Sequence, residues 1–456
     1  MNIPENIFKS YDIRGLVEGE LSEELAYRIG RSFAVFLKNN NLLTKGQKIV
    51  SGRDMRLTSL GFQNEIIRGL NDEGLNVVNI GLCSTPFFNF ACAYYPDYAG
   101  GVMVTASHNP AQYNGFKFTL GNGLAVGKES GMMDIKDMVL DNNFVDATEK
   151  GNVEEIDIFA DYRKKIFSLV KKENIKPLKI VVDAGNGMAK VTLPRILSEL
   201  PVDVEYLYLE PDGTFPNHEA NPLKIETLQD LQKKVVEVGA DFGFALDGDA
   251  DRIGLVDNKG QVVEASFVET MLGLEVLKNH PGGLMLYDLR SSQSVAEIWE
   301  SADGKVEMCR VGHAFIKKQM QDTKAIFGSE LSLHLYYEDM YKIEITDLSL
   351  LYILQMLSEK NKPLSEIWHA MKKYYHSGEI NFEVKDKEKV LNKLKEKYGK
   401  ANKVLELDGF SFYFADFWFN VRQSNTEPVL RLNLEADSEG LMREKVQEVS
   451  SIIQQG

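Results

Sequence analysis

This chain of 456 residues contains few cysteines and no long apolar run, and these absences exclude several classes of protein. Its 3 cysteines, Cys83, Cys92 and Cys309, are too few and too scattered for a disulfide framework or a zinc site. No run approaches the ~20 apolar residues that a membrane-spanning helix needs, and the first residues carry charges too early for a secretion signal. We therefore expect a cytoplasmic protein that has no membrane partner.

Basic residues are also scarce, since 52 Lys and Arg face 67 Asp and Glu and give a formal net charge of −15. A protein that binds nucleic acid needs a basic face, so we expect no nucleic-acid partner. A small anionic ligand responds to local charge and not to the net value, so an anionic substrate stays open.

Strand-like apolar runs alternate along the chain with polar loops and helical patterns, which is typical of α/β layers with a parallel-rich sheet. Residues 22–39 form an amphipathic helical pattern with Ser22 as its N-cap. An apolar run followed by Asp and then Gly, Arg or Ser occurs at 48–56, 179–187 and 283–292. We interpret these as three similar α/β units, each with a loop at the carboxyl end of a strand, where open α/β sheets bind ligands.

The pattern changes after about residue 366, where a smaller α+β domain begins. Strand-like segments occupy 410–422 and 428–437, and a helix follows from Glu439.

The first polar loop whose residues could take part in a reaction lies within GVMVTASHNPAQYNGFKF, residues 101–118. An apolar run leads to Ser107 and His108, and the turn Asn114-Gly115 presents Lys117. A hydroxyl beside a histidine, a lysine and turn N–H groups can hold or transfer a phosphoryl group. A structural turn with a satisfied histidine explains the same residues equally well. The loop matches neither the P-loop nor the GxSxG elbow of hydrolases.

The second loop is acidic, with the sequence DGDADR at 247–252 between two apolar strands. In an extended loop alternate side chains point the same way, so we expect Asp247, Asp249 and Asp251 to converge on one cation. Three carboxylates without His or Cys are hard oxygen ligands that suit Mg²⁺. Arg252 follows them directly and could neutralise a transferring phosphate.

Two other readings of the acidic loop are testable in the sequence. An EF-hand requires Gly and Glu where this chain has Arg252 and Asn258, so it is excluded. An aspartyl-phosphate phosphatase loop fits Asp247 and Asp249 but requires Thr or Val in place of Asp251. It stays open as a rival, with Asp247 as the residue that would carry the phosphate.

Two further segments carry polar side chains suited to a sugar phosphate. In GSELSLHLYY (328–337), Glu330, Ser332 and His334 alternate with leucines, so an extended strand would place the three polar side chains on one face. That face could bind sugar hydroxyls. Alternatively, the segment is an amphipathic edge strand whose polar face contacts solvent. The segment RQSNTEPVLR (422–431) combines a turn with two arginines and three small polar residues, which fits a phosphate monoester.

Seven motifs spread over nearly the whole chain resemble those of the α-D-phosphohexomutase superfamily, most closely its phosphomannomutase/phosphoglucomutase branch. They are YDIRG (11–15), GRDMR (52–56), TASHNP (105–110), DGTFPNHEANP (212–222), DGDADR (247–252), VGHAFIK (311–317) and SNTEP (424–428). The resemblance implies an α/β fold of three similar mixed-sheet α/β domains and a small C-terminal α+β lid domain. We predict the domain boundaries as 1–150 with the phosphoserine loop, 151–256 with the metal loop, 257–368 with the sugar loop and 369–456 with the phosphate loop.

The resemblance also implies a role for each matched residue. Ser107 would carry the phosphate and, with Asp247, Asp249 and Asp251, bind Mg²⁺. The catalytic group would comprise Ser107, His108, Lys117, Arg14 and Arg252. The substrate-binding group would comprise Tyr11, Arg290, His313, Glu330, Ser332, His334, Arg422, Ser424, Asn425, Thr426 and Arg431.

The implied activity is reversible phosphoryl transfer between O1 and O6 of a glucose or mannose phosphate. It would pass through a hexose 1,6-bisphosphate, with glucose 1,6-bisphosphate or its mannose analogue as activator. We expect Lys117 to act as the general base with a lowered pKa, and the chain to be a monomer or weak dimer.

One motif departs from the family pattern. The sugar loop, usually GEMSGH, is here SELSLH at residues 329–334, with Leu331 in place of Met and Leu333 in place of Gly. The loss of that glycine could change the backbone path near the sugar, and it leaves a non-catalytic sugar-phosphate binder as a third hypothesis.

Overall fold

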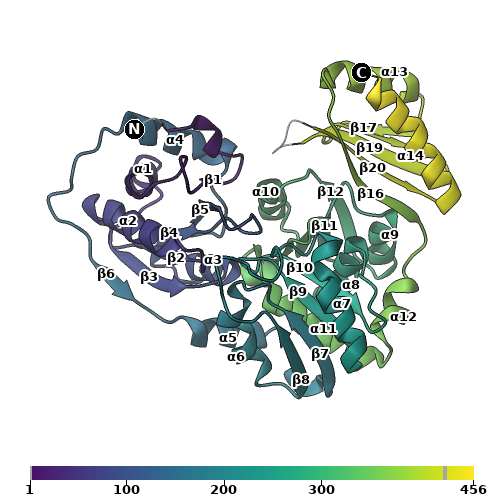
Figure 1. Ribbon diagram of the computed structural model, residues 1–456, viewed down its shortest axis with the longest axis horizontal. Coiled ribbons are helices and arrows are strands. Elements are labelled where there is room, and N and C mark those ends of the chain that lie inside the picture. Colours follow the sequence, from purple (N-terminus) through teal and green to yellow (C-terminus); the bar gives the residue numbers. More distant parts are fainter. Residues whose placement is uncertain (1–2, 425–428, 456) are drawn as a thin grey trace. The chain divides into compact units, whose positions relative to one another are not determined.

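The computed structural model describes residues 3–424 and 429–455. The chain forms two compact units (Figure 1), Met1–Val263 with Ser332–Ser365, and Glu264–Leu331 with Glu366–Gly456. None of the helices in the described residues has the length and apolar character needed to cross a membrane. Short 3₁₀ helices are η1 (Glu5–Ile7), η2 (Lys128–Ser130), η3 (Lys172–Asn174), η4 (Met188–Val191), η5 (Ile225–Leu228) and η6 (Glu338–Met340).

The first unit begins with a six-stranded sheet of order β1-β5-β4-β2-β3-β6. Strands β2, β3, β4 and β6 pair in parallel, whereas β5 pairs antiparallel with both β4 and β1. The strands are β1 (Ile13–Leu16), β2 (Lys48–Arg53), β3 (Val77–Leu82), β4 (Tyr98–Val104), β5 (Tyr113–Leu120) and β6 (Val153–Glu155). The helices of this region are α1 (Glu23–Asn39), α2 (Ser59–Asp72), α3 (Thr85–Tyr94) and α4 (Met132–Asp141).

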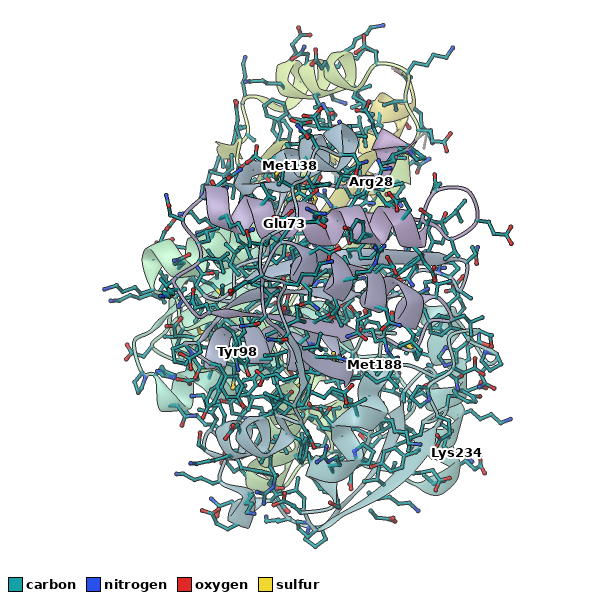
Figure 2. The ribbon with its side chains drawn as sticks, turned by 90° about the vertical axis from the view of Figure 1, so that its left-hand side faces the viewer. Arg28, Glu73, Tyr98, Met138, Met188 and Lys234 are labelled. Atoms are coloured by element: carbon teal, nitrogen blue, oxygen red, sulfur yellow. The ribbon has the colours of Figure 1, made fainter. Side chains whose placement is uncertain are left out.

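Helix α1 begins where the sequence predicts it. The Ser22 side chain accepts a hydrogen bond of 3.2 Å from the backbone N–H of Leu25, which is an N-cap. The apolar side of α1 joins a core shared with α2, α4 and the sheet. On its polar side, Arg31 Nε donates to Glu73 Oε1 at 2.8 Å and ties α1 to the end of α2. Glu73, Arg28 of α1 and Met138 of α4 are labelled in Figure 2.

The first unit also contains a four-stranded sheet of order β10-β9-β7-β8. Strand β7 pairs in parallel with β8 and β9, and β10 is antiparallel to β9. Its strands are β7 (Leu178–Asp183), β8 (Val202–Leu207), β9 (Phe242–Leu246) and β10 (Ile253–Asp257). The unit is completed by α5 (Phe159–Phe167), α6 (Leu193–Leu197), α7 (Gln229–Val238), α11 (Thr346–Lys360) and the antiparallel pair β14 (Leu335–Tyr337) and β15 (Ile343–Glu344).

The α/β part of the second unit is built on three parallel strands. Strand β11 (Leu284–Asp288) pairs with both β12 (Lys305–Cys309) and β13 (Phe327–Ser329). Its helices are α8 (Ala265–Asn279), α9 (Gln293–Ser301) and α10 (His313–Thr323). The short helix α12 (Leu364–His369) precedes the C-terminal domain along the chain.

The three recurring sequence segments share one local structure. Asp54, Asp183 and Asp288 each end or follow a strand and each accept a hydrogen bond from the backbone N–H two residues later, at 3.0, 2.9 and 2.8 Å. This Asx turn fixes the start of each loop, and all three aspartates are buried. What the three segments share is therefore a turn at the carboxyl end of a strand.

The C-terminal domain is an antiparallel sheet of order β16-β20-β19-β18-β17. Its elements are β16 (Tyr375–Phe382), α13 (Lys387–Tyr398), β17 (Lys403–Leu405), β18 (Phe410–Tyr413), β19 (Phe417–Gln423), β20 (Leu430–Ala436) and α14 (Glu439–Gln454). Side chains alternate along β19 and β20, so that one face packs against α13 and α14. The opposite face carries polar residues, among them Arg422 and Arg431. The predicted fold class, three α/β domains and an α+β domain, is confirmed.

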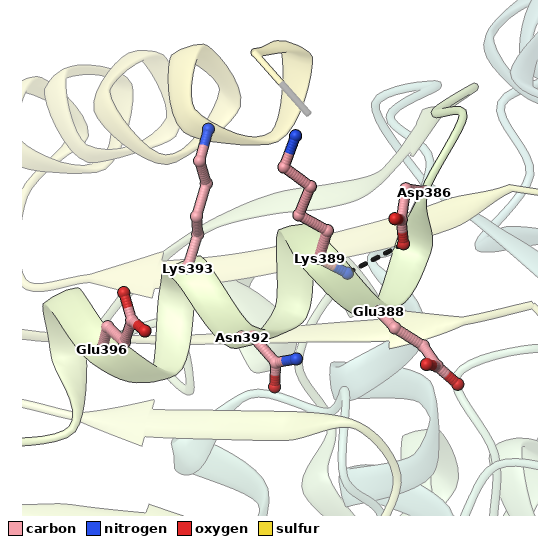
Figure 3. Close-up of a pocket in the computed structure, with 6 residues that line it drawn as sticks. All are labelled: Asp386, Glu388, Lys389, Asn392, Lys393 and Glu396. Carbon is pink, nitrogen blue, oxygen red and sulfur yellow. Dashed lines mark hydrogen bonds between the residues drawn. The ribbon is translucent and has the colours of Figure 1, made fainter.

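One predicted strand is wrong in extent. The segment 410–422 is not continuous, because Phe414 N–H donates to the Phe417 carbonyl at 2.9 Å and closes a hairpin between β18 and β19. At the start of α13, Asp386 caps the helix by accepting from Lys389 N–H at 3.0 Å (Figure 3). The outer side of this helix is lined with charged side chains and is a solvated surface.

A candidate phosphoryl-transfer site

Ser107 lies in a strained turn directly after β4. Its backbone has a φ of 49°, in the left-handed region that few non-glycine residues adopt. The backbone N–H of Ser107 donates to Thr105 Oγ1 at 2.9 Å. Ser107 Oγ donates to Asp247 Oδ2 at 3.1 Å and lies 3.2 Å from His108 Nδ1. The hydroxyl predicted to carry phosphate therefore touches the acidic loop.

The three aspartates of the acidic loop converge, although not for the predicted reason. The loop is a turn and not an extended segment, because Ala250 N–H donates to the Asp247 carbonyl at 3.1 Å and Ala250 has a φ of 59°. All three side chains are buried, and one oxygen from each of Asp247, Asp249 and Asp251 lies within 4.8 Å of the others. A turn brings alternate side chains together here as effectively as a strand would.

Close approach between the two loops depends on Gly248. A Cβ at this position would lie 2.6 Å from the Ser107 carbonyl oxygen, which is too close for any other residue. The glycine of DGDADR therefore lets the acidic loop pack against the backbone of the serine loop.

The acidic cluster fits a hard divalent cation. Burial, and then the charges of Asp251 and Asp249, raise the pKa of Asp247 well above its usual value. Asp249 Oδ1 is buried and has no hydrogen-bond partner among the described residues. Carboxylate oxygens that are crowded, buried and partly unsatisfied are the ligands that Mg²⁺ prefers.

Cationic and imidazole groups surround the same carboxylates. Lys117 Nζ lies 2.7 Å from both Asp249 Oδ2 and Asp251 Oδ2. Arg252 Nε lies 3.9 Å from Asp247 Oδ2. His334 Nε2 lies 3.2 Å from Arg252 Nε and 3.3 Å from Asp251 Oδ1. Each of the three carboxylates therefore has a cationic group within 3.9 Å.

The expectation of a lowered pKa for Lys117 is wrong in this arrangement. Burial alone lowers the pKa of the ammonium, but the adjacent Asp249 and Asp251 raise it above its usual value. Lys117 is therefore held as a cation by the two carboxylates, and its role as a general base stays a prediction.

Arg14, Tyr11 and His108 are further predicted residues of the first unit. Arg14, at the start of β1, donates through Nη1 to Asn109 Oδ1 at 2.8 Å and pairs with Asp12. Tyr11 is half-buried in the segment before β1. Burial, followed by the charges of Arg252 and Arg14, lowers the pKa of His108 well below its usual value, so the imidazole is neutral.

The sugar loop is not the extended strand that the alternating pattern predicts. Residues 331–333 form a turn between β13 and β14, and Leu333 takes a φ of 65°. Leu333 thus keeps a left-handed backbone at the position where the family pattern has glycine. Within the first unit, Ser332 Oγ lies 3.2 Å from His334 Nδ1, which connects this loop to Arg252.

Arg56 is a functional candidate that sequence reasoning missed. Its guanidinium is buried and donates to four backbone carbonyls of the serine loop. Nη2 donates to Ser107 and Asn109 at 2.9 and 2.6 Å, and Nη1 donates to Pro110 and Tyr113 at 2.8 and 2.9 Å. Its position in GRDMR was a signal, since an arginine two residues after a strand-end aspartate can lie against that aspartate.

The second unit holds the other predicted residues. Arg290 is buried and donates to both oxygens of Asp288. Glu330 Oε1 accepts from Gly312 N–H at 2.9 Å, beside His313 at the start of α10. The strand β19 carries Arg422, and Ser424 lies just after its end.

Arg422 and Arg431 are directly opposite one another across β19 and β20. Both arginines contact the carboxylate of Glu379 in β16. The predictions for Asn425 and Thr426 lie outside the described residues.

Comparison with known proteins identifies relatives along the whole chain. Models of the phosphoglucomutase/phosphomannomutase family match as alpha/beta/alpha domain I at residues 5–145, domain II at 157–260, domain III at 268–374 and the C-terminal domain at 379–451. The domain boundaries that we expect from the sequence stay predictions.

Individual proteins agree with the family models. A phosphomannomutase of Methanocaldococcus jannaschii is 39% identical over 98% of this chain and 97% of its own. A phosphomannomutase of Escherichia coli K12 is 36% identical over 94% of each chain. The crystal structure of a phosphoglucomutase/phosphomannomutase family protein from Burkholderia thailandensis has a TM-score of 0.90 at 29% identity, covering 99% of this chain and 98% of that one.

Proposed function

The chain belongs to the phosphoglucomutase/phosphomannomutase family and is a hexose-phosphate mutase, and from this premise we propose that it transfers phosphate through Ser107. The observation that carries the proposal is the contact between Ser107 Oγ and Asp247 Oδ2, at 3.1 Å. Asp247 also lies 3.9 Å from Arg252 Nε, and Lys117 contacts the other two aspartates. Cation ligands and fixed positive charges of this kind are the groups that phosphoryl transfer requires.

The proposed reaction has two transfers. In the first, the bond between Ser107 Oγ and phosphorus breaks while the free O1 or O6 hydroxyl of a hexose phosphate forms a new bond to phosphorus and loses its proton. The product is a hexose 1,6-bisphosphate. In the second, the other phosphate returns to Ser107 Oγ, so glucose 1,6-bisphosphate or its mannose analogue acts as activator.

The residues of the chain have distinct proposed roles. Asp247, Asp249 and Asp251 would hold Mg²⁺, which when bound neutralises charge on the transferring phosphoryl group. Arg252 supplies a fixed positive charge beside that group. Lys117 is our candidate for the group that takes the hydroxyl proton, which would require its release from at least one of its two carboxylate partners.

The substrate's other phosphate and its sugar would bind to the second group of residues. Arg422 and Arg431 present guanidinium groups from neighbouring strands, and arginine forks match phosphate oxygens. Glu330 and His334 are candidates for the sugar hydroxyls. Mannose and glucose phosphates are the proposed substrates, because the sugar loop retains Glu330, Ser332 and His334 of the family pattern.

The test is an isomerisation assay. Purified protein is incubated with Mg²⁺, a trace of glucose 1,6-bisphosphate and either glucose 1-phosphate or mannose 1-phosphate, and the 6-phosphates are followed. We expect conversion by the wild type and none by Ser107→Ala. Equal conversion by the two proteins would contradict the role of Ser107, and inactivity of the wild type on both sugars would contradict the proposed substrates.

A further inference from the structure

Three arginines of the second unit converge on one carboxylate that the sequence analysis did not single out. Glu379 Oε2 lies 2.7 Å from Arg422 Nη2 and 3.2 Å from Arg290 Nη1, and Glu379 Oε1 lies 3.1 Å from Arg431 Nη1. The Arg422 side chain is 1% exposed and that of Arg431 is 17% exposed. A single carboxylate thus contacts both arginines proposed to bind phosphate.

The strand register explains why such a carboxylate is needed. Arg422 and Arg431 are cross-strand partners on β19 and β20. Like charges directly opposite each other destabilise a sheet. Strand β16 lies on the other side of β20, and Glu379 reaches from it with one oxygen toward each arginine. Its negative charge offsets the repulsion between the two guanidinium groups.

An irregularity in β16 directs Glu379 to this face of the sheet. Between His376 and Glu379, β16 has one residue more than the opposing stretch of β20, and Gly378 has a φ of 70°. Such a bulge changes which face the following side chain occupies. The extra residue keeps His376 and Glu379 on the same face, where His376 Nε2 lies 3.0 Å from the Arg290 carbonyl oxygen.

The electrostatics agree with this geometry. Burial lowers the pKa of Arg422, and the nearby charge of Arg290 lowers it further, so the cations repel one another. Burial alone raises the pKa of Glu379, but Arg290, Arg422 and Arg431 outweigh it and hold the pKa below its usual value. Glu379 is therefore ionised throughout the neutral range and compensates charge permanently.

We propose that Glu379 is a positioning residue for the substrate's non-transferring phosphate, because its carboxylate holds Arg422 and Arg431 side by side. The inference rests on the proposed role of these two arginines. An arginine has five N–H groups, and Arg422 donates from Nη2 to Glu379. Arg422 Nε is buried and has no hydrogen-bond partner among the described residues, so a phosphate oxygen would satisfy it.

Arg290 takes a different part in this arrangement. Its Nε donates at 2.9 Å to both oxygens of Asp288, its Nη2 pairs with the same carboxylate, and its Nη1 contacts Glu379. All three of its nitrogens are thereby engaged by protein carboxylates. Arg290 anchors Glu379 to the loop after β11.

The experiment measures phosphate binding directly. Inorganic phosphate and glucose 6-phosphate are titrated calorimetrically into the full-length wild type, Glu379→Gln, Glu379→Asp and Glu383→Gln. The last variant is a matched control, because Glu383 is an exposed glutamate just after the same strand. We expect Glu379→Gln to weaken binding of both ligands about tenfold, since charged hydrogen bonds that orient the arginines are lost.

Kinetics separate positioning from a general structural role. We expect Glu379→Gln to raise KM about tenfold while kcat changes less than about twofold. Glu379→Asp, which keeps the charge, should recover part of the affinity, and the control should match the wild type. The thermal unfolding midpoint of each variant establishes whether it is folded. If Glu379→Gln is not folded, the comparison of Glu379→Asp with the wild type tests the inference.

Two results would overturn the inference. Unchanged binding by Glu379→Gln would mean that the arginines need no support, and tighter binding would mean that the carboxylate competes with phosphate for them. A wild type that binds phosphate but does not isomerise hexose phosphates would contradict the proposed function alone. A wild type that does not bind either ligand would contradict both.

Discussion

The buried carboxyl of Asp347 leads to a prediction about stability and pH. Asp347 lies in the first turn of α11 and is 2% exposed. Tyr162 Oη donates to it at 2.7 Å and Thr192 Oγ1 at 3.2 Å. Burial nevertheless raises its pKa from 3.8 to about 6, because the two hydroxyls do not replace the solvation of a carboxylate.

The sign of the effect follows from linkage. Because the pKa is higher in the folded state, the stability associated with Asp347 is fully present below pH 3.8 and is lost as pH rises through about 6. The difference between these two values, at about 1.4 kcal/mol for each pH unit, corresponds to about 3 kcal/mol. Asp347→Asn cannot ionise, so at pH 7.5 it should be more stable than the wild type by up to that amount.

The assay compares thermal or urea-induced unfolding of the wild type and Asp347→Asn between pH 4 and pH 8. We expect the two proteins to be similar near pH 4 and to separate in favour of the variant above pH 6. Asp203→Asn, at a side chain that is 75% exposed, is the control and should show no such separation. A difference between wild type and Asp347→Asn that stays constant with pH would refute the reasoning.

Three further predictions concern the site itself. Arg56→Met should lower kcat at least about a hundredfold, since misplacing a reacting group by about 1 Å has effects of that size, and KM should change little. Arg56→Lys should be intermediate, because one ammonium group cannot donate to four carbonyls. A rise in KM as large as the fall in kcat would contradict a positioning role. Asp249→Asn should raise the Mg²⁺ concentration for half-maximal activity about tenfold or more, because an amide replaces a charged ligand; an unchanged requirement would exclude Asp249 as a ligand. Leu333→Gly should be more stable than Leu333→Ala by about 1 kcal/mol, because only glycine adopts a positive φ without strain, and urea unfolding in which alanine is the more stable would contradict this backbone assignment.

Much of the fold could be predicted because its signals are local. The N-cap at Ser22 and the Asx turns at Asp54, Asp183 and Asp288 each depend on a few consecutive residues. The hairpin inside 410–422 was missed because aromatic residues continue through the turn and conceal it. Local pattern identifies a strand more reliably than it locates the end of one.

The candidate site was predictable as a set of residues but not as an arrangement. The convergence of Asp247, Asp249 and Asp251 arises from a turn, which the alternating sequence does not distinguish from a strand. The raised pKa of Lys117 depends on carboxylates more than 130 positions away, at sequence separations of 132 and 134. The bulge that aims Glu379 at its arginines depends on pairing with β20, although Gly378 within β16 is a sequence signal for such a bulge.

The identity of the phosphorylated residue tests the central claim most directly. The wild-type protein is incubated with Mg²⁺ and glucose 1,6-bisphosphate, and the site of modification is located by tandem mass spectrometry before and after glucose 1-phosphate is added. Our account predicts a phosphate on Ser107 that is passed to the added sugar. Phosphate on Asp247 in place of Ser107, or isomerisation with no phosphate on Ser107 at any stage, would contradict it.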